Sequence, residues 1–566
     1  MAYIVKQPAS HGRIIIYLAE SRHIPGKGAR QIRTYLGSLD TKSNELILNA
    51  KAKEPNPEVL ELLKAKGIAY GNRKADGPGR KHTRKASPSM QKQLMSDLEK
   101  SDVFEVGRVN CFNFLATESG LLSCLEKTFG DISKRILSAA IYQASEAMPL
   151  YLAGEWASDI GNQDGMSSST LSRMIDALGS DSALLSTFFT HWIEACGKPT
   201  SVIHDTTSLS SYSDSIDEVE WGYNRDGESL PQVNMALVVA KDSNLPIWFR
   251  MIPGSIPDVA SLKLTCTILK SLGLKQFSFS LDRGYFSRTN LIEMIENKIG
   301  FTIGVPTTQT QATNLILAHK ALLESTESSF LYNGKRMRHT TCEYQITNHD
   351  KSLTKLSGHL FLDLERRESI TGRMETTILE LDKLGSNQEF KTRLEAEAWI
   401  TEKARKLTHY FKIMGNENKW IISRDTDAIT QAISTAGVAL ILSSKNSLKA
   451  EEVLDDYRCR DIAENVFDTV KNGIGLHRLR TSSSTQANGR LFLAFIAVIL
   501  RALIESKLNK SNLLSKYSVD ESLAILKKIK QIKLLDGTVV NLEIPKKARI
   551  IQEAIESKVP KVEAPK

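Results

Sequence analysis

The sequence predicts a mixed α/β protein whose central sheet is interrupted by an α+β insertion and preceded by small β/α and helical regions. Three observations lead to this prediction. Apolar residues recur at helical spacing from residue 101 to about 195. From about residue 199 the pattern changes to short apolar runs bounded by turn-forming residues, which is typical of strands. That rhythm breaks after residue 305 and returns near 444, so residues 306–443 are interpreted as an inserted domain.

The core sheet is expected in residues 199–305, completed by residues 444–508. Its strands are predicted at Ser201–His204, Val233–Ala240, Leu245–Ile252, Phe277–Leu281 and Gly300–Val305. Helical stretches at Asp258–Leu272 and Arg288–Asn297 separate the last three strands. The order β-β-β-α-β-α-β describes an antiparallel meander that leads into crossover units. Ribonuclease H-like folds share this order.

The remaining segments are assigned from local patterns. Residues 1–70 hold two strand-like stretches on either side of IPGKGA, which predicts a hairpin, and a helix around Pro57–Lys66. Residues 71–100 are rich in Lys, Arg, Gly, Pro and Ser, as in a basic linker. Residues 101–198 are predicted to be helical. Helices are also expected at Lys449–Asn472 and Gly489–Leu508, and residues 509–566 form a tail that is either a dimerisation segment or disordered.

Composition narrows the class of protein. A chain of 566 residues is too long for one core and predicts several domains. The formal charge of +9 suits a polyanionic partner but is only a weak indication. The six cysteines form no CxxC pair, which disfavours a zinc ribbon and fits reduced thiols in the cytoplasm. The longest apolar run, Leu491–Leu500, is too short to span a bilayer, and no P-loop or HExxH motif occurs, so we expect no membrane and no nucleotide cofactor.

The helix predicted near residue 457 has two distinct faces. At about 100° per residue, four polar side chains fall within a sector of about 60°: Tyr457, Arg460, Glu464 and Lys471. The apolar residues of the same segment form the opposite face: Cys459, Ile462, Val466 and Val470. By periodicity alone, this is an amphipathic helix with one solvated Arg460–Glu464 pair.

The spacing of these four polar residues carries more information than their common face. Y-x2-R-x3-E-x6-K resembles the YREK signature of bacterial insertion-sequence DDE transposases. Two further segments resemble the blocks of that family that carry its two aspartates: Ser201-Val-Ile-His-Asp205-Thr-Thr and Phe279-Ser-Leu-Asp282-Arg-Gly-Tyr-Phe286. Glu464 follows Asp282 by 182 residues, as in members with an insertion before the glutamate.

The resemblance implies an enzyme that cuts and rejoins DNA. Asp205, Asp282 and Glu464 would be the catalytic carboxylates and would hold two Mg²⁺ ions, for which Mn²⁺ would substitute. Hard oxygen ligands suit Mg²⁺, and two such ions about 3.5–4 Å apart can activate the attacking oxygen and stabilise the leaving one. The residues expected to contact DNA are Tyr457, Arg460, Lys471, Arg283, Arg478 and Arg480. The implied partners are double-stranded DNA, as terminal inverted repeats and as target, and a second copy of the chain at the paired ends.

Several roles stay open at this point. The linker 71–100 is either an arm that follows the DNA backbone or a solvated spacer, and the helical region 101–198 either binds DNA ends or is a scaffold. Arg283 either touches DNA or pairs with a carboxylate, and Arg478 and Arg480 either extend the DNA surface or belong to a basic loop. Trp399 or Trp420 either stacks on a flipped base or packs in a core.

Three residues near the acids are weaker candidates. His204 faces away from Asp205 on a strand and is expected in the core. Asp226 and Asp258 sit in turn-like surroundings and are discounted as metal ligands.

Two alternative functions remain: a ribonuclease H-like nuclease that does not rejoin strands, and an inactive DNA-binding protein descended from a transposase. Strand transfer of pre-cut ends tests the first alternative, and metal-dependent nicking tests the second.

Overall fold

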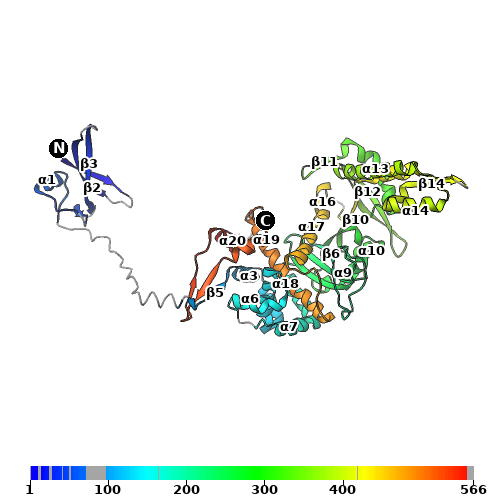
Figure 1. Ribbon diagram of the computed structural model, residues 1–566, viewed down its shortest axis with the longest axis horizontal. Helices are drawn as coiled ribbons and strands as arrows, with labels where there is room; N and C mark the ends of the chain where they lie inside the picture. The colour runs from blue at the N-terminus through cyan, green and yellow to red at the C-terminus, as the bar shows by residue number, and fades with distance from the viewer. Residues whose placement is uncertain are drawn as a thin grey trace. The chain divides into compact units, whose positions relative to one another are not determined.

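The computed structural model describes residues 2–9, 14–24, 28–40, 43–49, 52–71, 97, 99–162, 165–416, 419–445 and 447–557. These residues form two compact units, one within residues 1–101 and one within 102–566 (Figure 1). The predicted basic linker, residues 71–100, lies almost entirely outside the described residues. All the predicted site residues belong to the larger unit.

The described part of the smaller unit is an antiparallel sheet in the order β1-β2-β3-β4, followed by one helix. The elements are β1 (Ala2–Pro8), β2 (Ile14–Ile24), β3 (Gly28–Asp40), β4 (Glu45–Leu48) and α1 (Pro57–Ala65). Leu63 of α1 is fully buried with Ile16 and Leu46 of the sheet. The predicted hairpin, β2 with β3, and the predicted helix are confirmed. Strand β1 was missed because Ile4 is its one buried residue, which leaves no alternating pattern in the sequence.

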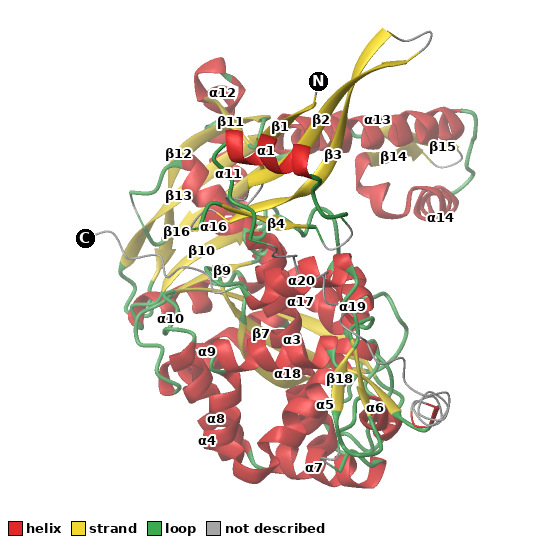
Figure 2. Cartoon of the chain, turned by 90° about the vertical axis from the view of Figure 1, so that its left-hand side faces the viewer, coloured by secondary structure: helices red, strands yellow, loops and turns green. Residues whose placement is uncertain are grey.

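In the described part of the larger unit, a mixed sheet of nine strands is the central element (Figure 2). Its order is β11-β12-β13-β16-β10-β9-β6-β7-β8. The predicted core is confirmed as β6 (Ser201–Ser210), β7 (Gln232–Ala240), β8 (Pro246–Pro253), α9 (Asp258–Ser271), β9 (Ser278–Leu281), α10 (Arg288–Glu296) and β10 (Gly300–Val305). Strands β6 and β10 flank β9 in parallel, whereas β6, β7 and β8 pair antiparallel.

The sheet continues through much of the segment that was expected to be inserted. Strands β11 (Ser329–Tyr332), β12 (Lys335–Thr347), β13 (Leu353–Asp363) and β16 (Val438–Ser443) extend it antiparallel from β10. The part with a core of its own is shorter and consists of α13 (Leu364–Ser386), α14 (Arg393–Ala404), β14 (Phe411–Asn416), β15 (Lys419–Arg424) and α15 (Thr426–Thr435). Two helices, α11 (Thr310–Ala318) and α12 (Lys320–Glu324), lead from β10 into the extension.

A histidine pair in this extension makes stability depend on pH. Burial, together with the neighbouring His359, lowers the pKa of His339 to about 4 from 6.5. Between pH 6.5 and 4, His339 is protonated in the unfolded chain but neutral in the folded protein. The free energy of unfolding should therefore fall as the pH drops through this range. We expect His339→Gln to reduce this slope by about 1.4 kcal/mol per pH unit. Urea unfolding at pH 4.5, 5.5 and 7 measures the free energy of unfolding of both proteins. An equal dependence on pH in the wild type and in His339→Gln would contradict the role of His339.

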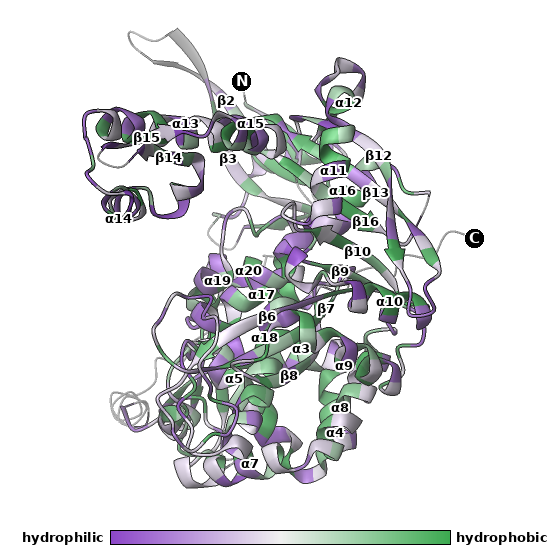
Figure 3. Ribbon diagram, turned by 90° about the vertical axis from the view of Figure 1, so that its right-hand side faces the viewer, coloured by the Kyte–Doolittle hydropathy of each residue, from purple (hydrophilic) through white to green (hydrophobic). Residues whose placement is uncertain are grey.

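The predicted helical region, residues 101–198, is confirmed as helical and begins with a short strand. It contains β5 (Asp102–Glu105), α3 (Gly107–Glu118), α4 (Leu121–Phe129), α5 (Ser133–Glu146), α6 (Ala153–Asp159), α7 (Ser168–Ser180) and α8 (Ser182–Ala195). These helices gather around α18 (Ser484–Lys510), whose predicted apolar run is buried (Figure 3). Helices α7 and α18 approach each other so closely that only glycine fits at position 489. A Cβ there would lie 1.9 Å from the Ile175 carbonyl oxygen.

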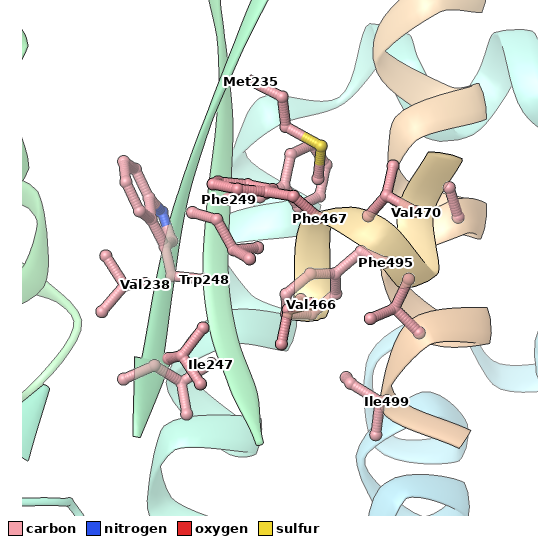
Figure 4. Close-up of a cluster of buried hydrophobic side chains, with 14 of the residues drawn as sticks. Met235, Val238, Ile247, Trp248, Phe249, Val466, Phe467, Val470, Phe495 and Ile499 are labelled. Atoms are coloured by element: carbon pink, nitrogen blue, oxygen red, sulfur yellow. The ribbon is translucent and has the colours of Figure 1, made fainter. Parts of the chain in front are cut away.

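Helix α18 and the sheet share one apolar core (Figure 4). Phe495 of α18 packs with Phe249 of β8, their ring centroids 5.3 Å apart, and with Val466 and Phe467 from the segment that carries Glu464. None of the described helices is long and apolar enough to cross a membrane. All six cysteines are free, as expected for reduced thiols.

The tail is folded through residue 557, so of the two alternatives for residues 509–566, a dimerisation segment or disorder, disorder is wrong for most of them. They form α19 (Val519–Leu526), β17 (Lys530–Lys533), β18 (Val539–Asn541) and α20 (Lys546–Glu556). Strand β17 pairs with β5, and α20 buries Ile551 and Ile555 in the main core. The apolar face of α20 supplies the burial that offsets the entropy of ordering this segment. The last residues, 558–566, lie outside the described part.

Candidate active site

Asp205 and Asp282 lie on neighbouring parallel strands. Strand β6 pairs with β9 in a register that joins Val202 to Phe279 and Ile203 to Ser280. Continuing this register by two residues sets Asp205 beside Asp282, which follows β9 in an extended conformation with φ −74° and ψ 162°. Strands pair about 4.8 Å apart, and residues in register point to the same face. The predicted end of this strand at His204 is wrong, because β6 continues through Asp205 to Ser210 alongside β7.

The surroundings of Asp205 disfavour its charged form. Burial raises the pKa of Asp205 to about 7, and the nearby Asp258 and Asp282 carboxylates add to the shift. The Thr206 backbone N–H, which donates to Asp205 Oδ1 at 2.8 Å, and the guanidinium of Arg225 oppose it. A cation bound here would relieve the crowding of the carboxylates.

Asp282 is held by two of the residues of the YREK spacing. Arg460 Nη1 lies 2.5 Å from Asp282 Oδ1, and the Tyr457 hydroxyl donates to the same oxygen at 3.4 Å. The Arg460 guanidinium also stacks on the Tyr457 ring, with its central carbon 4.2 Å from the ring centroid. Gly304 of β10 makes room for this ring, because a Cβ there would lie 2.4 Å from the Tyr457 hydroxyl oxygen.

The segment that carries these residues is not one straight helix, so the expectation of a single helix at Lys449–Asn472 is wrong. It divides into α16 (Ala450–Arg458), α17 (Asp461–Asp468) and a π-helical turn, η7 (Thr469–Gly473). At the first break Arg460 Nε donates to the Tyr457 carbonyl at 3.0 Å, and Ala463 N bonds back three residues to Arg460 at 2.8 Å. A side chain therefore takes the acceptor that a continuous helix would use.

Glu464 lies on α17 and lines the same cavity as Asp282. This cavity has a volume of about 740 Å³, and Arg283, Tyr457 and Arg460 also line it. Asp205 is not among its lining residues. Within the described residues, no three His, Cys, Asp or Glu side chains stand together closely enough to hold a metal ion. The structure thus brings Asp205 next to Asp282 and brings Asp282 and Glu464 to one cavity, without gathering all three carboxylates.

Lys471 and Arg478, which were also predicted to contact DNA, lie outside this cavity and pair with acids of another segment. Lys471, on the π-helical turn, pairs with Asp226 at 2.6 Å, and Arg478 pairs with Glu228 at 2.8 Å. Both acids belong to the connection between β6 and β7. Sequence reasoning discounted Asp226 and did not single out Glu228, and nothing in their spacing signals contact with residues some 250 positions away. Arg480 is exposed, and so is Arg283.

The weaker candidates His204 and Asp258 make contacts that stabilise the fold. His204 is 1 % exposed, its Nδ1 lies 3.2 Å from the Leu237 carbonyl oxygen, and burial lowers its pKa to about 4, as expected of a core histidine. Asp258 forms an ion pair with Arg225. Trp399 and Trp420 are partly buried and pack against the core of the inserted segment.

The strand order β8-β7-β6-β9-β10, antiparallel over β6 to β8 and parallel from β6 through β9 to β10, is the ribonuclease H-like arrangement. It sets two carboxylates on adjacent central strands, beside a cavity lined by a glutamate and cations. Residues 197–500 match the family described as the transposase DDE domain, and the chain belongs to this family of DNA-cutting and DNA-transposing enzymes. No curated protein matches the sequence. A solved structure described as a piggyBac transposase synaptic complex with hairpin DNA is similar at a TM-score of 0.33 and 11 % identity, covering 76 % of this chain and 82 % of that one.

Proposed function

We propose that the protein is a cut-and-paste transposase that cleaves DNA at inverted-repeat ends and joins each free 3′-hydroxyl to target DNA. The observation that carries the proposal is the neighbouring position of Asp205 and Asp282, next to a cavity that Glu464, Tyr457 and Arg460 line. Membership of the transposase family supplies the reaction class. The catalytic residues are Asp205, Asp282 and Glu464.

The donor set fits divalent ions of the Mg²⁺ type. All three proposed ligands are carboxylates, and hard oxygen ligands of this kind suit Mg²⁺. Burial is the main cause of the raised pKa of Asp205, and the nearby Asp258 and Asp282 carboxylates add to it. When bound, two Mg²⁺ ions, or Mn²⁺ in their place, would activate the attacking oxygen and stabilise the leaving one. Because these carboxylates are not gathered beforehand, Glu464 must approach the two aspartates as the site forms, which the breaks on both sides of α17 permit.

Arg460 has two successive partners in this proposal. In the described state it neutralises Asp282. If Asp282 held a cation, the Arg460 guanidinium would be free within the same cavity to hold a DNA phosphate through paired N–H groups. Burial raises the pKa of Tyr457, which keeps its hydroxyl protonated as a donor to the same phosphate. Arg283 lines the cavity and adds positive charge where the DNA backbone would lie.

The remaining cations extend the DNA surface in this proposal. Lys471, Arg478 and Arg480 would contact the duplex beyond the cut end, and a homodimer would pair the two ends. The helices of residues 101–198 are proposed to bind the terminal repeats.

The reaction is tested with a plasmid that carries the gene and its native flanking DNA. We expect nicking and excision with Mg²⁺ or Mn²⁺ and none with EDTA. Pre-cut ends should be joined to a second plasmid, which separates a transposase from a nuclease that only cuts. Failure of cleavage with every divalent ion would favour a DNA-binding protein without activity.

Lys471 should contribute one phosphate contact. We expect Lys471→Ala to weaken binding to linear duplex DNA and to reduce the slope of log affinity against log salt by about one. Asp226→Asn should strengthen binding, because it releases Lys471 from its ion pair. Fluorescence anisotropy at four salt concentrations measures both variants. Lys275→Ala, at an exposed lysine before β9, is the matched control. An unchanged salt slope in Lys471→Ala would exclude this contact.

A further inference from the structure

A second cavity, of about 800 Å³, opens where the helical region meets the segment after the π-helical turn. Its walls come from the end of α5, the short turn Leu150–Leu152, helix α7, residues 475–481 and the first turns of α18. Cavities of roughly 300–1,000 Å³ are typical of sites for small organic ligands. This space therefore exceeds what a lone phosphate or a water cluster needs.

The charge of the cavity is positive and only partly compensated. Arg478, Arg480 and Arg490 line it against one acid, Glu228, which leaves a net charge of +2. Glu228 is already paired with Arg478. Arg490 Nη1 donates to Gln143 Oε1 at 2.7 Å, and within the described residues no carboxylate pairs with Arg490. Burial lowers the pKa of Arg490 to about 10, so the guanidinium still carries its charge at neutral pH. A partly buried guanidinium with no carboxylate partner is a position at which an anion can bind.

The same cavity offers an apolar surface for a ring. Tyr151 is 66 % exposed and Met148 is 49 % exposed, and both line it beside Leu150. Large apolar side chains left this open beside arginines are the combination with which proteins hold single-stranded nucleic acid, because bases stack on aromatic rings while cations hold phosphates.

We propose that this cavity binds an unpaired nucleotide of a DNA strand, with its phosphate on Arg490 and its base against Tyr151. The inference rests on the proposed function, since it places the strand next to the DNA surface described above. The loop that joins β6 to β7 connects the two places, because its Asp226 pairs with Lys471 and its Glu228 pairs with Arg478 at the cavity. This continuity favours a nucleotide within a DNA strand over a free nucleotide.

The test compares two DNA probes in EDTA, so that no cleavage is required. One probe is a blunt fluorescent duplex, and the other is the same duplex with a three-nucleotide single-stranded extension. We expect the full-length protein to bind the extended probe about tenfold more tightly. Arg490→Gln and Tyr151→Ala should each remove this preference, measured for each variant as the ratio of its affinities for the two probes. Arg173→Gln, at an exposed arginine of α7 outside the cavity, should keep the preference.

The outcomes separate the alternatives. Equal preference in wild type, Arg490→Gln and Tyr151→Ala would overturn the site. Competition by a free deoxynucleoside monophosphate as effective as the extended strand would overturn the DNA strand as its source. Thermal melting shows whether Arg490→Gln still folds. If it does not, Tyr151→Ala still tests the site, because it removes a ring that is largely exposed. Because binding is measured in EDTA, failure of the protein to cleave DNA would not change this result, so the two proposals fail separately.

Discussion

Asp282→Asn is expected to lower DNA cleavage on the order of 10³-fold or more while leaving binding to duplex DNA intact. The substitution keeps the shape of the side chain and removes one carboxylate charge. That charge is the common partner of Arg460 and Tyr457 and the neighbour of Asp205. The measurement is the rate of nicking of the plasmid with native flanks under saturating Mg²⁺, together with anisotropy on the same DNA ends.

The control for this variant is another acid-to-amide change, at a turn that follows a strand of the same sheet. Asp242→Asn, at an exposed residue just after β7, should cleave as the wild type does. Glu464→Gln should match Asp282→Asn, and the double variant should be no slower than either single one, because residues that act as a unit lose their effect together. Full activity in Asp282→Asn would remove this residue from the active site.

Phe495→Ala is expected to destabilise the larger unit by about 3–5 kcal/mol. The Phe495 side chain is 1 % exposed and lies between Phe189, with ring centroids 5.6 Å apart, and Phe249. It also supports Val466 and Phe467, which anchor the helix that carries Glu464 (Figure 4). The cavity left by the ring cannot collapse easily, because rigid strands and helices surround it on several sides. Urea unfolding followed by tryptophan fluorescence measures the loss.

An exposed aromatic residue provides the comparison for that loss. Tyr223→Ala removes a ring that is 83 % exposed and should change stability by no more than about 0.5 kcal/mol. DNA cleavage by Phe495→Ala should fail at a lower temperature than cleavage by the wild type, since unfolding of this core releases Glu464. A loss below about 1 kcal/mol in Phe495→Ala would contradict the central place of this ring in the core.

The core strands were predictable because their signals are local. Strands β6 to β10 and helices α9 and α10 each bury a continuous or periodic apolar run, and turn-forming residues bound them. The extension of the sheet was not predictable, since β12 alternates irregularly between buried and exposed residues. Whether such a strand joins an existing sheet or forms a separate domain depends on pairing partners far away in sequence. Val438–Ser443 pairs with both β10 and β13, which no local pattern encodes.

The sequence by itself determined the chemistry available to this protein: the three acids, the Tyr, Arg and Lys of the YREK spacing, and the strand order that sets Asp205 beside Asp282. The tertiary structure alone decided how those groups are partnered. Arg460 bonds the Tyr457 carbonyl between α16 and α17, and Glu464 of α17 lies at the cavity with Asp282. Lys471 lies on the π-helical turn after α17 and pairs with Asp226. The physical reason is that periodicity records which face of a helix is apolar, whereas ion pairs and helix breaks depend on charges that folding brings together from distant parts of the chain.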